Sequence, residues 1–197
     1  KGEYTALARA LGVPILDLRP GGDTKVNPLE DPQGRLEFAH ALAALCLERP
    51  LLAVERATLS STVRLLPDRP LVSDLAAILR EMPGVLCDEL SMTQPAALDE
   101  TKGLRFGFGE LLSGVHAGMF DGHTNVDLAG SPLGFVVDVS GSGTDDRTLR
   151  FALLAGMRAV DQLVGSAPER TLLVNDETWR LAGNRDTVIW LQHSFKL

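Results

Sequence analysis

The sequence predicts an α/β protein in which a parallel sheet is flanked by helices and carries an inserted all-helical lobe. Three observations predict this class. Short apolar runs alternate with helical patterns in the last third of the chain. The two clearest runs, 133–139 and 171–175, are almost continuously apolar, as in strands that are buried on both faces. Between residues 35 and 118, apolar residues recur at helical spacing.

The composition is that of a globular protein and limits its partners. The chain has 197 residues, 45% hydrophobic and 23% charged, which is enough for one sizeable core. Its net charge of −7 does not by itself attract nucleic acid or anionic lipid. Cys46 and Cys87 lie in apolar, helix-like stretches, which favours reduced core residues over a disulfide. No stretch has the roughly 18–20 apolar residues of a transmembrane segment.

The first part of the chain, residues 1–34, is expected to begin the sheet. Residues 3–11 show a helical pattern, and apolar and β-branched residues at 13–18 predict a strand. A Gly-rich loop follows at 19–23. An Asn-Pro pair comes next, and its Pro28 favours an extended conformation at the asparagine.

The middle of the chain, residues 35–118, predicts a lobe of four or five helices. Apolar residues recur there at intervals of three and four, and the repeats are separated by Pro50, Pro67, Pro70, Pro83 and Pro95. Short connections of this kind join helices that pack against their neighbours in sequence.

The last part of the chain returns to alternating strands and helices. Asp145 and Asp146 suit the first turn of a long helix, because the helix dipole favours negative charge there. The elements expected are an edge strand, a buried strand, a long helix, a further strand and a final helix, at 124–128, 133–139, 145–164, 171–175 and from about 184.

Two adjacent carboxylates, Asp176 and Glu177, directly follow the apolar run at 171–175. In open parallel sheets, ligands bind at the carboxyl ends of the strands, and burying unpaired charge for stability alone is costly. A P-loop ATPase needs such a pair, one acid for Mg²⁺ and one for the attacking water. A helix-capping pair or a solvated turn is the simpler alternative. No Gly-x-x-x-x-Gly-Lys-Ser/Thr loop occurs in the 197 residues.

The other motifs favour ordinary structural roles. Gly141-Ser142-Gly143 lacks the lysine of a phosphate-binding loop, and it predicts a strand-to-helix turn. No histidine has a cysteine or histidine partner at metal-ligand spacing, so the sequence predicts no metal site besides nucleotide-bound Mg²⁺; the four are His40, His116, His123 and His193.

Several short segments occur in an order that indicates a protein family more specifically than any one of the segments does alone. They are Lys1-Gly2-Glu3-Tyr4, Asn27-Pro28-Leu29, Met119-Phe120-Asp121-Gly122, the run at 135–139, and Leu172 to Arg180 with its Asp-Glu-x-Trp-Arg. In this order they resemble the motor domain of type IV secretion (conjugative-transfer) ATPases, in the HerA–FtsK superfamily of P-loop NTPases. The family places a Gly-Glu-Tyr turn first, an Asn-Pro pair before a helical insertion, and a Walker B segment after it.

The resemblance implies a partial RecA-like core made of residues 1–34 and 119–197, with the lobe at 35–118 inserted into it. It implies ATP and Mg²⁺ as cofactors of the parent protein. Asp176 would bind the nucleotide's Mg²⁺ through water, and Glu177 would orient or deprotonate the attacking water. Glu3 would assist close to the γ-phosphate. Arg180 would pair with an acid in the sheet or face a neighbouring subunit.

The resemblance also implies partners and a location. Family members assemble as rings, often hexamers, and act at the cytoplasmic face of the membrane. Other secretion-system subunits at the inner membrane, and DNA or protein cargo, are the expected partners. The family's P-loop would precede Lys1, so we expect this chain to be a piece of a longer protein that does not bind or hydrolyse ATP by itself.

Two alternatives remain at the level of sequence. The first is a non-catalytic scaffold or interaction domain of a transfer apparatus, with a degenerate NTPase fold. The second is an unrelated α/β binding module of the response-regulator kind. A regular βα alternation would favour that module, and the helical insertion at 35–118 argues against it.

Overall fold

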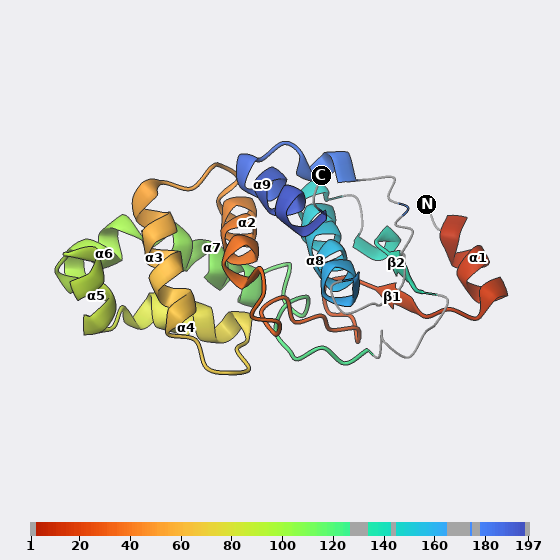
Figure 1. Cartoon of the computed structure of the whole chain (residues 1–197), viewed down its shortest axis with the longest axis horizontal. Helices are drawn as coiled ribbons and strands as arrows, with labels where there is room; N and C mark the ends of the chain where they lie inside the picture. The colour runs from red at the N-terminus through yellow and green to blue at the C-terminus, as the bar shows by residue number, and fades with distance from the viewer. Residues whose placement is uncertain (1–2, 127–133, 143–144, 165–173, 175–177, 196–197) are drawn as a thin grey trace.

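The computed structural model describes residues 3–126, 134–142, 145–164, 174 and 178–195. A small sheet lies at one end of the molecule and a group of helices at the other (Figure 1). The sheet pairs strand β1 (Ile15–Asp17) with strand β2 (Val136–Asp138) in parallel, with Ile15 opposite Val136 and Asp17 opposite Asp138. Parallel strands need a crossover connection, and the helices between them supply it.

Two helices cover opposite faces of this sheet. Helix α8 (Asp146–Val164) lies so close to β2 that a Cβ added at Gly156 would stand 2.8 Å from Cγ1 of Val137. Helix α1 (Glu3–Leu11) lies on the other face, where the Thr5 hydroxyl donates to the carboxylate of Asp138 over 3.2 Å. Successive side chains of a strand point to opposite faces, which is why neighbouring residues of β2 meet different helices.

Six helices follow one another between the two strands: α2 (Arg35–Leu47), α3 (Ala53–Arg64), α4 (Val72–Glu81), α5 (Gly84–Leu90), α6 (Gln94–Glu100) and α7 (Lys102–Ser113). The sequence predicted four or five. Its helical spacing is confirmed, and the difference lies in the short α5 and α6. Seven residues each are too few to show a repeat of 3.6 residues clearly.

Helix α2 is the centre of the molecule. It is apolar on nearly all sides, and it packs against α3, α7, α8 and the final helix α9 (Arg185–Phe195). A helix that is hydrophobic all round is buried by its neighbours. Phe38 of α2 meets Trp190 of α9 edge to face, with ring centroids 5.6 Å apart. Cys46 and Cys87 are free and buried, as predicted, and burial raises the pKa of the Cys46 thiol to about 12.

The helical group leaves and rejoins the rest of the chain at one place, where two loops lie side by side. The amide of Gly21 donates to the carbonyl of Ala117 over 3.0 Å, and Lys25 bonds to Gly118 and Asp121. Gly118 has a φ of +90°, and a Cβ there would stand 2.8 Å from the nitrogen of Gly21. Only glycine combines this φ with such a close approach.

The expected elements agree with the observed ones at several places. The predicted helices at 3–11, at 145–164 and from about 184 are confirmed by α1, α8 and α9, and strands lie within the runs predicted at 13–18 and 133–139. Residues 124–126 form no strand, although an edge strand was predicted there; the rest of that run, 127–128, lies outside the described residues.

One predicted strand has little structural description. Of the run at 171–175, the structure describes only Val174, which is not in a strand and is 62% exposed. Within the described residues, β1 and β2 pair only with each other. Val174 therefore does not show the burial on both faces that the apolar run predicted.

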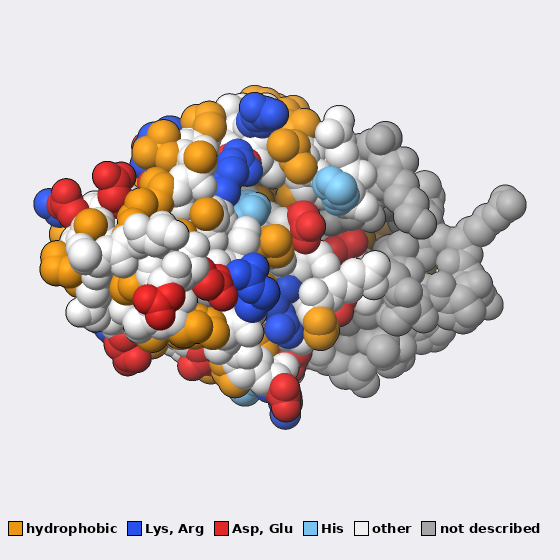
Figure 2. All heavy atoms as spheres, turned by 60° about the vertical axis from the view of Figure 1, so that its left-hand side comes forward, with side chains coloured by type: hydrophobic (Ala, Val, Ile, Leu, Met, Phe, Trp, Pro, Cys, Tyr) orange, Lys and Arg blue, Asp and Glu red, His pale blue; other side chains and the backbone are white. Residues whose placement is uncertain are grey.

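The surface is mixed in character on the face that Figure 2 shows. Basic side chains gather near the middle of that face with acidic side chains beside them, and hydrophobic side chains are scattered between. None of the helices in the described part of the chain combines the length and apolar character that a membrane crossing requires.

Candidate functional site

The residues predicted to carry the chemistry lie mostly outside the described part of the chain. Asp176 and Glu177 both do. Glu3 is the first residue of α1, and its side chain is not described. The structure does describe the carboxyl edge of the sheet and the beginnings of α8 and α9.

Both strands end in an aspartate at the carboxyl edge of the sheet. Asp17 and Asp138 are register partners. Oδ1 of Asp138 accepts the amide of Ser140 over 2.9 Å, and its other oxygen accepts the hydroxyl of Thr5. Burial alone would raise the pKa of Asp138, but the hydrogen bonds from Ser140 and Thr5 hold that pKa below its ordinary value. The carboxylate is therefore kept charged at the edge where a ligand would bind.

The turn after β2 packs tightly against the end of β1. Arg19 forms a 3.1 Å ion pair with Asp17. A Cβ added at Gly141 would stand 3.0 Å from Oδ1 of Asp17 and 3.0 Å from Cδ of Arg19. The hydroxyl of Ser142 donates to the carbonyl of Leu18 over 3.2 Å. Residues 140–142 form one 3₁₀ turn, η1, which in the chain lies between β2 and α8, where the sequence predicted a strand-to-helix turn.

Sequence reasoning passed over Asp17 and Asp138 as site candidates. Each is the last residue of its strand, so the signal was an acid that directly follows an apolar run. Carboxylate and hydroxyl oxygens are the donors that Mg²⁺ takes in proteins, so the edge has suitable chemistry. Within the described residues, no group of three or more His, Cys, Asp or Glu side chains could hold a metal ion.

Asp145 caps the beginning of α8. Its carboxylate accepts the amide of Thr148 over 2.8 Å and also the Thr148 hydroxyl. These hydrogen bonds hold the pKa of Asp145 below its ordinary value. Nδ1 of His116 lies 3.0 Å from the same hydroxyl. Because that hydroxyl donates its proton to Asp145, the imidazole nitrogen is the donor in the second bond.

Asp146, the first residue of α8, joins two arginines. Oδ2 pairs with Arg150 at 2.7 Å, and Oδ1 pairs with Arg180 at 3.0 Å. Arg180 belongs to a short 3₁₀ turn, η2 (Thr178–Leu181), and its guanidinium lies 4.6 Å from the ring centre of Trp179. The sequence predicted that Arg180 would pair with an acid in the sheet or face another subunit. The pairing is observed, but the acid is at a helix start.

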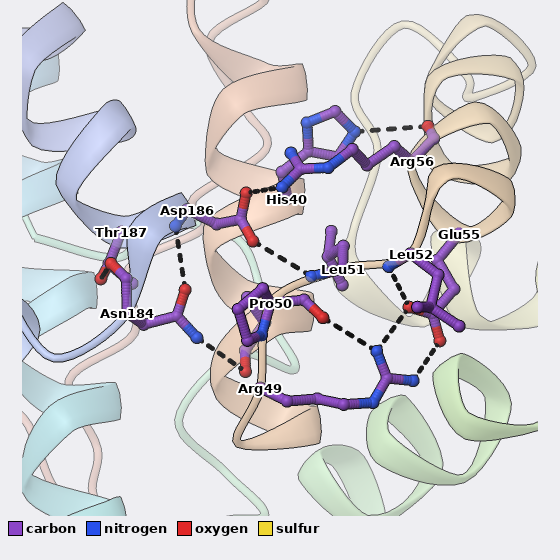
Figure 3. A network of polar contacts seen from close by, with 11 residues as sticks. His40, Arg49, Pro50, Leu51, Leu52, Glu55, Arg56, Asn184, Asp186 and Thr187 are labelled. Atoms are coloured by element: carbon purple, nitrogen blue, oxygen red, sulfur yellow. Dashed lines mark hydrogen bonds and ion pairs between the residues drawn. The ribbon is translucent and has the colours of Figure 1, made fainter.

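The beginning of α9 is tied to the segment between α2 and α3 (Figure 3). Asp186 has a side chain only 1% exposed, and it forms an ion pair with Arg56 of α3. Its other oxygen accepts the amide of Leu51 over 3.2 Å. Next to it, Arg49 makes two hydrogen bonds to the carboxylate of Glu55, of 2.8 and 2.6 Å. These contacts connect α9 with the helices of the lobe.

Comparison with known proteins identifies the fold. No model of a known protein family matches the sequence, and no curated protein sequence matches it. A solved structure does match: VirB4 of Thermoanaerobacter pseudethanolicus, with a TM-score of 0.72 and 21% identity, over 98% of this chain and 79% of that chain. At this identity the likeness concerns the fold. Over nearly its whole length, the chain has the fold of VirB4.

Proposed function

We propose that this chain is part of the ATP-hydrolysing motor of a type IV secretion, or conjugative-transfer, apparatus. The observation that carries the proposal is the likeness to VirB4, a type IV secretion ATPase, over 98% of the chain. The order of the sequence motifs supports the same function independently, because that order is a property of the sequence and does not depend on the likeness in fold. The proposal includes a RecA-like core made of residues 1–34 and 119–197, with a helical lobe at residues 35–118 inserted into it.

In the proposed motor, the carboxyl edge of the sheet faces the nucleotide. Asp138 ends β2 there as a charged carboxylate, and Asp176 follows the next apolar run of the chain. Asp176 holds Mg²⁺ through water, and Glu177 orients or deprotonates the water that attacks the γ-phosphate. Bound Mg²⁺ offsets the negative charge of the phosphates. Glu3 assists from the beginning of α1, whose Thr5 contacts Asp138.

The phosphate-gripping loop is proposed to come from polypeptide outside these 197 residues, because none of them forms a Walker A sequence. We also propose ring assembly and a place at the cytoplasmic face of the membrane for the intact protein, with other secretion-system subunits as partners and DNA or protein as cargo. If the full-length protein bound no ATP, the alternative of a non-catalytic scaffold would be favoured instead.

The substitution Glu177→Gln tests the catalytic role in the full-length protein. Removing a general base costs about 10²–10⁴-fold in rate, so we expect turnover to fall by at least about 100-fold while ATP binding is retained. The measurements are phosphate release and nucleotide binding. Glu81→Gln is the matched control, since Glu81 is an exposed acid of α4, and we expect it to hydrolyse ATP like the unmodified protein. Unchanged hydrolysis in Glu177→Gln would refute the assigned role.

The 197-residue chain alone tests where the phosphates are gripped. Without a Walker A loop it lacks the amides and the lysine that hold a triphosphate. We expect no measurable heat of binding when ATP and Mg²⁺ are titrated into it by calorimetry. A clear saturable titration would show that the 197-residue chain holds the nucleotide without a Walker A loop, against this expectation.

A further inference from the structure

The ion pairs at the beginning of α8 connect it to the segment that carries the proposed Walker B acids. Asp146 divides its two carboxylate oxygens between Arg150 on the same helix and Arg180 on η2. The Arg150 pair spans i to i+4 within α8. The ion pair of Arg180 with Asp146 instead joins two different elements, because the two residues are 34 positions apart in sequence.

Besides this ion pair, the η2 turn contacts the rest of the molecule through Leu181, whose carbonyl accepts the hydroxyl of Thr187. Leu181 is buried in the core, and the amide of Ala182 donates to the carbonyl of Trp179 over 3.1 Å. Trp179 itself is 65% exposed, and one of its contacts is the guanidinium of Arg180 over its ring. A cation above an indole ring is attracted to it, so the stacking favours the position from which Arg180 pairs with Asp146.

We propose that Arg180 is a positioning residue for ATP hydrolysis, acting by tying η2 to the first turn of α8. The proposal rests on the proposed function. Thr178, the first residue of η2, directly follows Glu177 in the chain. Fixing η2 therefore leaves only a few backbone torsions free between the tether and the catalytic carboxylate. A displacement of about 1 Å can cost about 10²-fold in rate, so such a tether acts on catalysis.

The same pair contributes little to folding. The side chains of Arg180 and Asp146 are 29% and 51% exposed, and exposed ion pairs stabilise proteins weakly. A structural role and a positioning role thus predict different results. Loss of the pair should leave the melting temperature nearly unchanged and reduce turnover.

The experiment is a double-mutant cycle in the full-length protein with Arg180→Met, Asp146→Asn and the double variant. We expect each single variant to lower kcat by about 10- to 100-fold, with the KM for ATP within about twofold. Residues that act through one contact are not additive, so the double variant should lose no more than the worse single one. Each melting temperature should stay within about 4 °C of that of the unmodified protein, because exposed ion pairs stabilise proteins weakly.

Two controls separate the tether from a general charge effect. Arg150→Met removes the partner of Asp146 that lies on α8 itself, and we expect kcat within about twofold of the unmodified protein, since η2 stays attached. Hydrogen–deuterium exchange of the 197-residue chain gives a readout without nucleotide. Arg180→Met should raise exchange at Ala182, whose amide the turn protects, and Arg150→Met should not.

The outcomes distinguish this proposal from the function on which it rests. An unchanged kcat in Arg180→Met, additive losses in the cycle, or a loss of activity that follows a large fall in melting temperature would each overturn the positioning role. Equal exchange at Ala182 in all variants would overturn the tether itself. If the unmodified protein hydrolysed no ATP while Arg180→Met still raised that exchange, the tether would stand and the proposed function would fall.

Discussion

Arg158 and Asn27 hold the loop between β1 and α2 from two sides. Arg158 is completely buried; it donates to the carbonyls of Pro28, Asp31 and Gln33 and pairs with Asp161 at 2.7 Å. Asn27 is equally buried, and its amide donates to Pro70 just before α4. The carbonyl of Pro28 is buried, and a buried carbonyl without a donor is costly, so this loop depends on Arg158, which lies far away in sequence.

The substitution Arg158→Met should therefore destabilise the protein strongly. It leaves three carbonyls without their donor and a carboxylate without its cation, and breaking a buried charged pair costs about 3–5 kcal/mol. Urea unfolding of the 197-residue chain measures the change. Arg9→Met on the exposed side of α1 is the control. A loss below about 1 kcal/mol, in the range of surface pairs, would show that water replaces the guanidinium.

His116 gives the fold a dependence on pH. Burial and the neighbouring Arg147 lower the pKa of His116 below its ordinary value of 6.5. Below pH 6.5, His116 is protonated in the unfolded chain, while in the folded chain it stays neutral to a lower pH. The free energy of unfolding therefore falls as the pH falls. His40 has its pKa lowered by burial in the same direction. We expect His116→Gln to reduce this loss of stability between pH 7.5 and 5.5.

Urea unfolding at the two pH values measures that dependence. His193→Gln is the matched control, because His193 is exposed on α9, and it should keep the slope of the unmodified chain. A slope that is unchanged in His116→Gln would mean that other groups set the dependence.

At the scale of elements, α9 is joined to the lobe by Asp186. The carboxylate is buried and accepts from Arg56 and from the amide of Leu51. Hydrogen bonds to charged groups contribute about 1.5–3 kcal/mol, so Asp186→Asn should lower the free energy of unfolding by that amount. Asp99→Asn on the exposed side of α6 should change nothing measurable. An equal effect of the two would contradict the role of this link.

Local chemistry explains which elements could be predicted. Helix α8 was predicted with its correct bounds because Asp145 and Asp146 mark its beginning and an amphipathic repeat continues to Val164. The Asp186 link was not predicted, and the acid that pairs with Arg180 was expected in the sheet, because these contacts join residues 130 and 34 positions apart. No spacing rule reaches that far without the fold, and the same holds for the two aspartates at the sheet edge.

At the scale of the whole molecule, one hydrophobic core runs from the lobe into the rest of the chain. It includes Phe38 of α2, Phe108 of α7, Phe151 of α8 and Trp190 of α9. Among the residues that the structure describes, a separate small cluster lies around Met82, at the far end of the helical group. The inserted lobe is therefore expected to fold together with the core.

Unfolding followed by two probes tests this cooperativity. In a Trp179→Phe variant, the fluorescence of Trp190 reports on the contact of α9 with α2. Far-ultraviolet circular dichroism of the same variant reports on all helices. We expect the two curves to coincide in urea, as they do for a two-state transition. Two separate transitions would show that residues 35–118 form an independent domain.

The central claim concerns the place of two carboxylates that follow an apolar run. A crystal structure of the full-length protein with Mg²⁺ and a non-hydrolysable ATP analogue tests it most directly. We predict that the triphosphate lies beyond the carboxyl ends of β1 and β2, with Asp176 in the water shell of Mg²⁺ and Glu177 beside the γ-phosphate. A nucleotide bound elsewhere, or these two side chains turned away from it, would contradict the account.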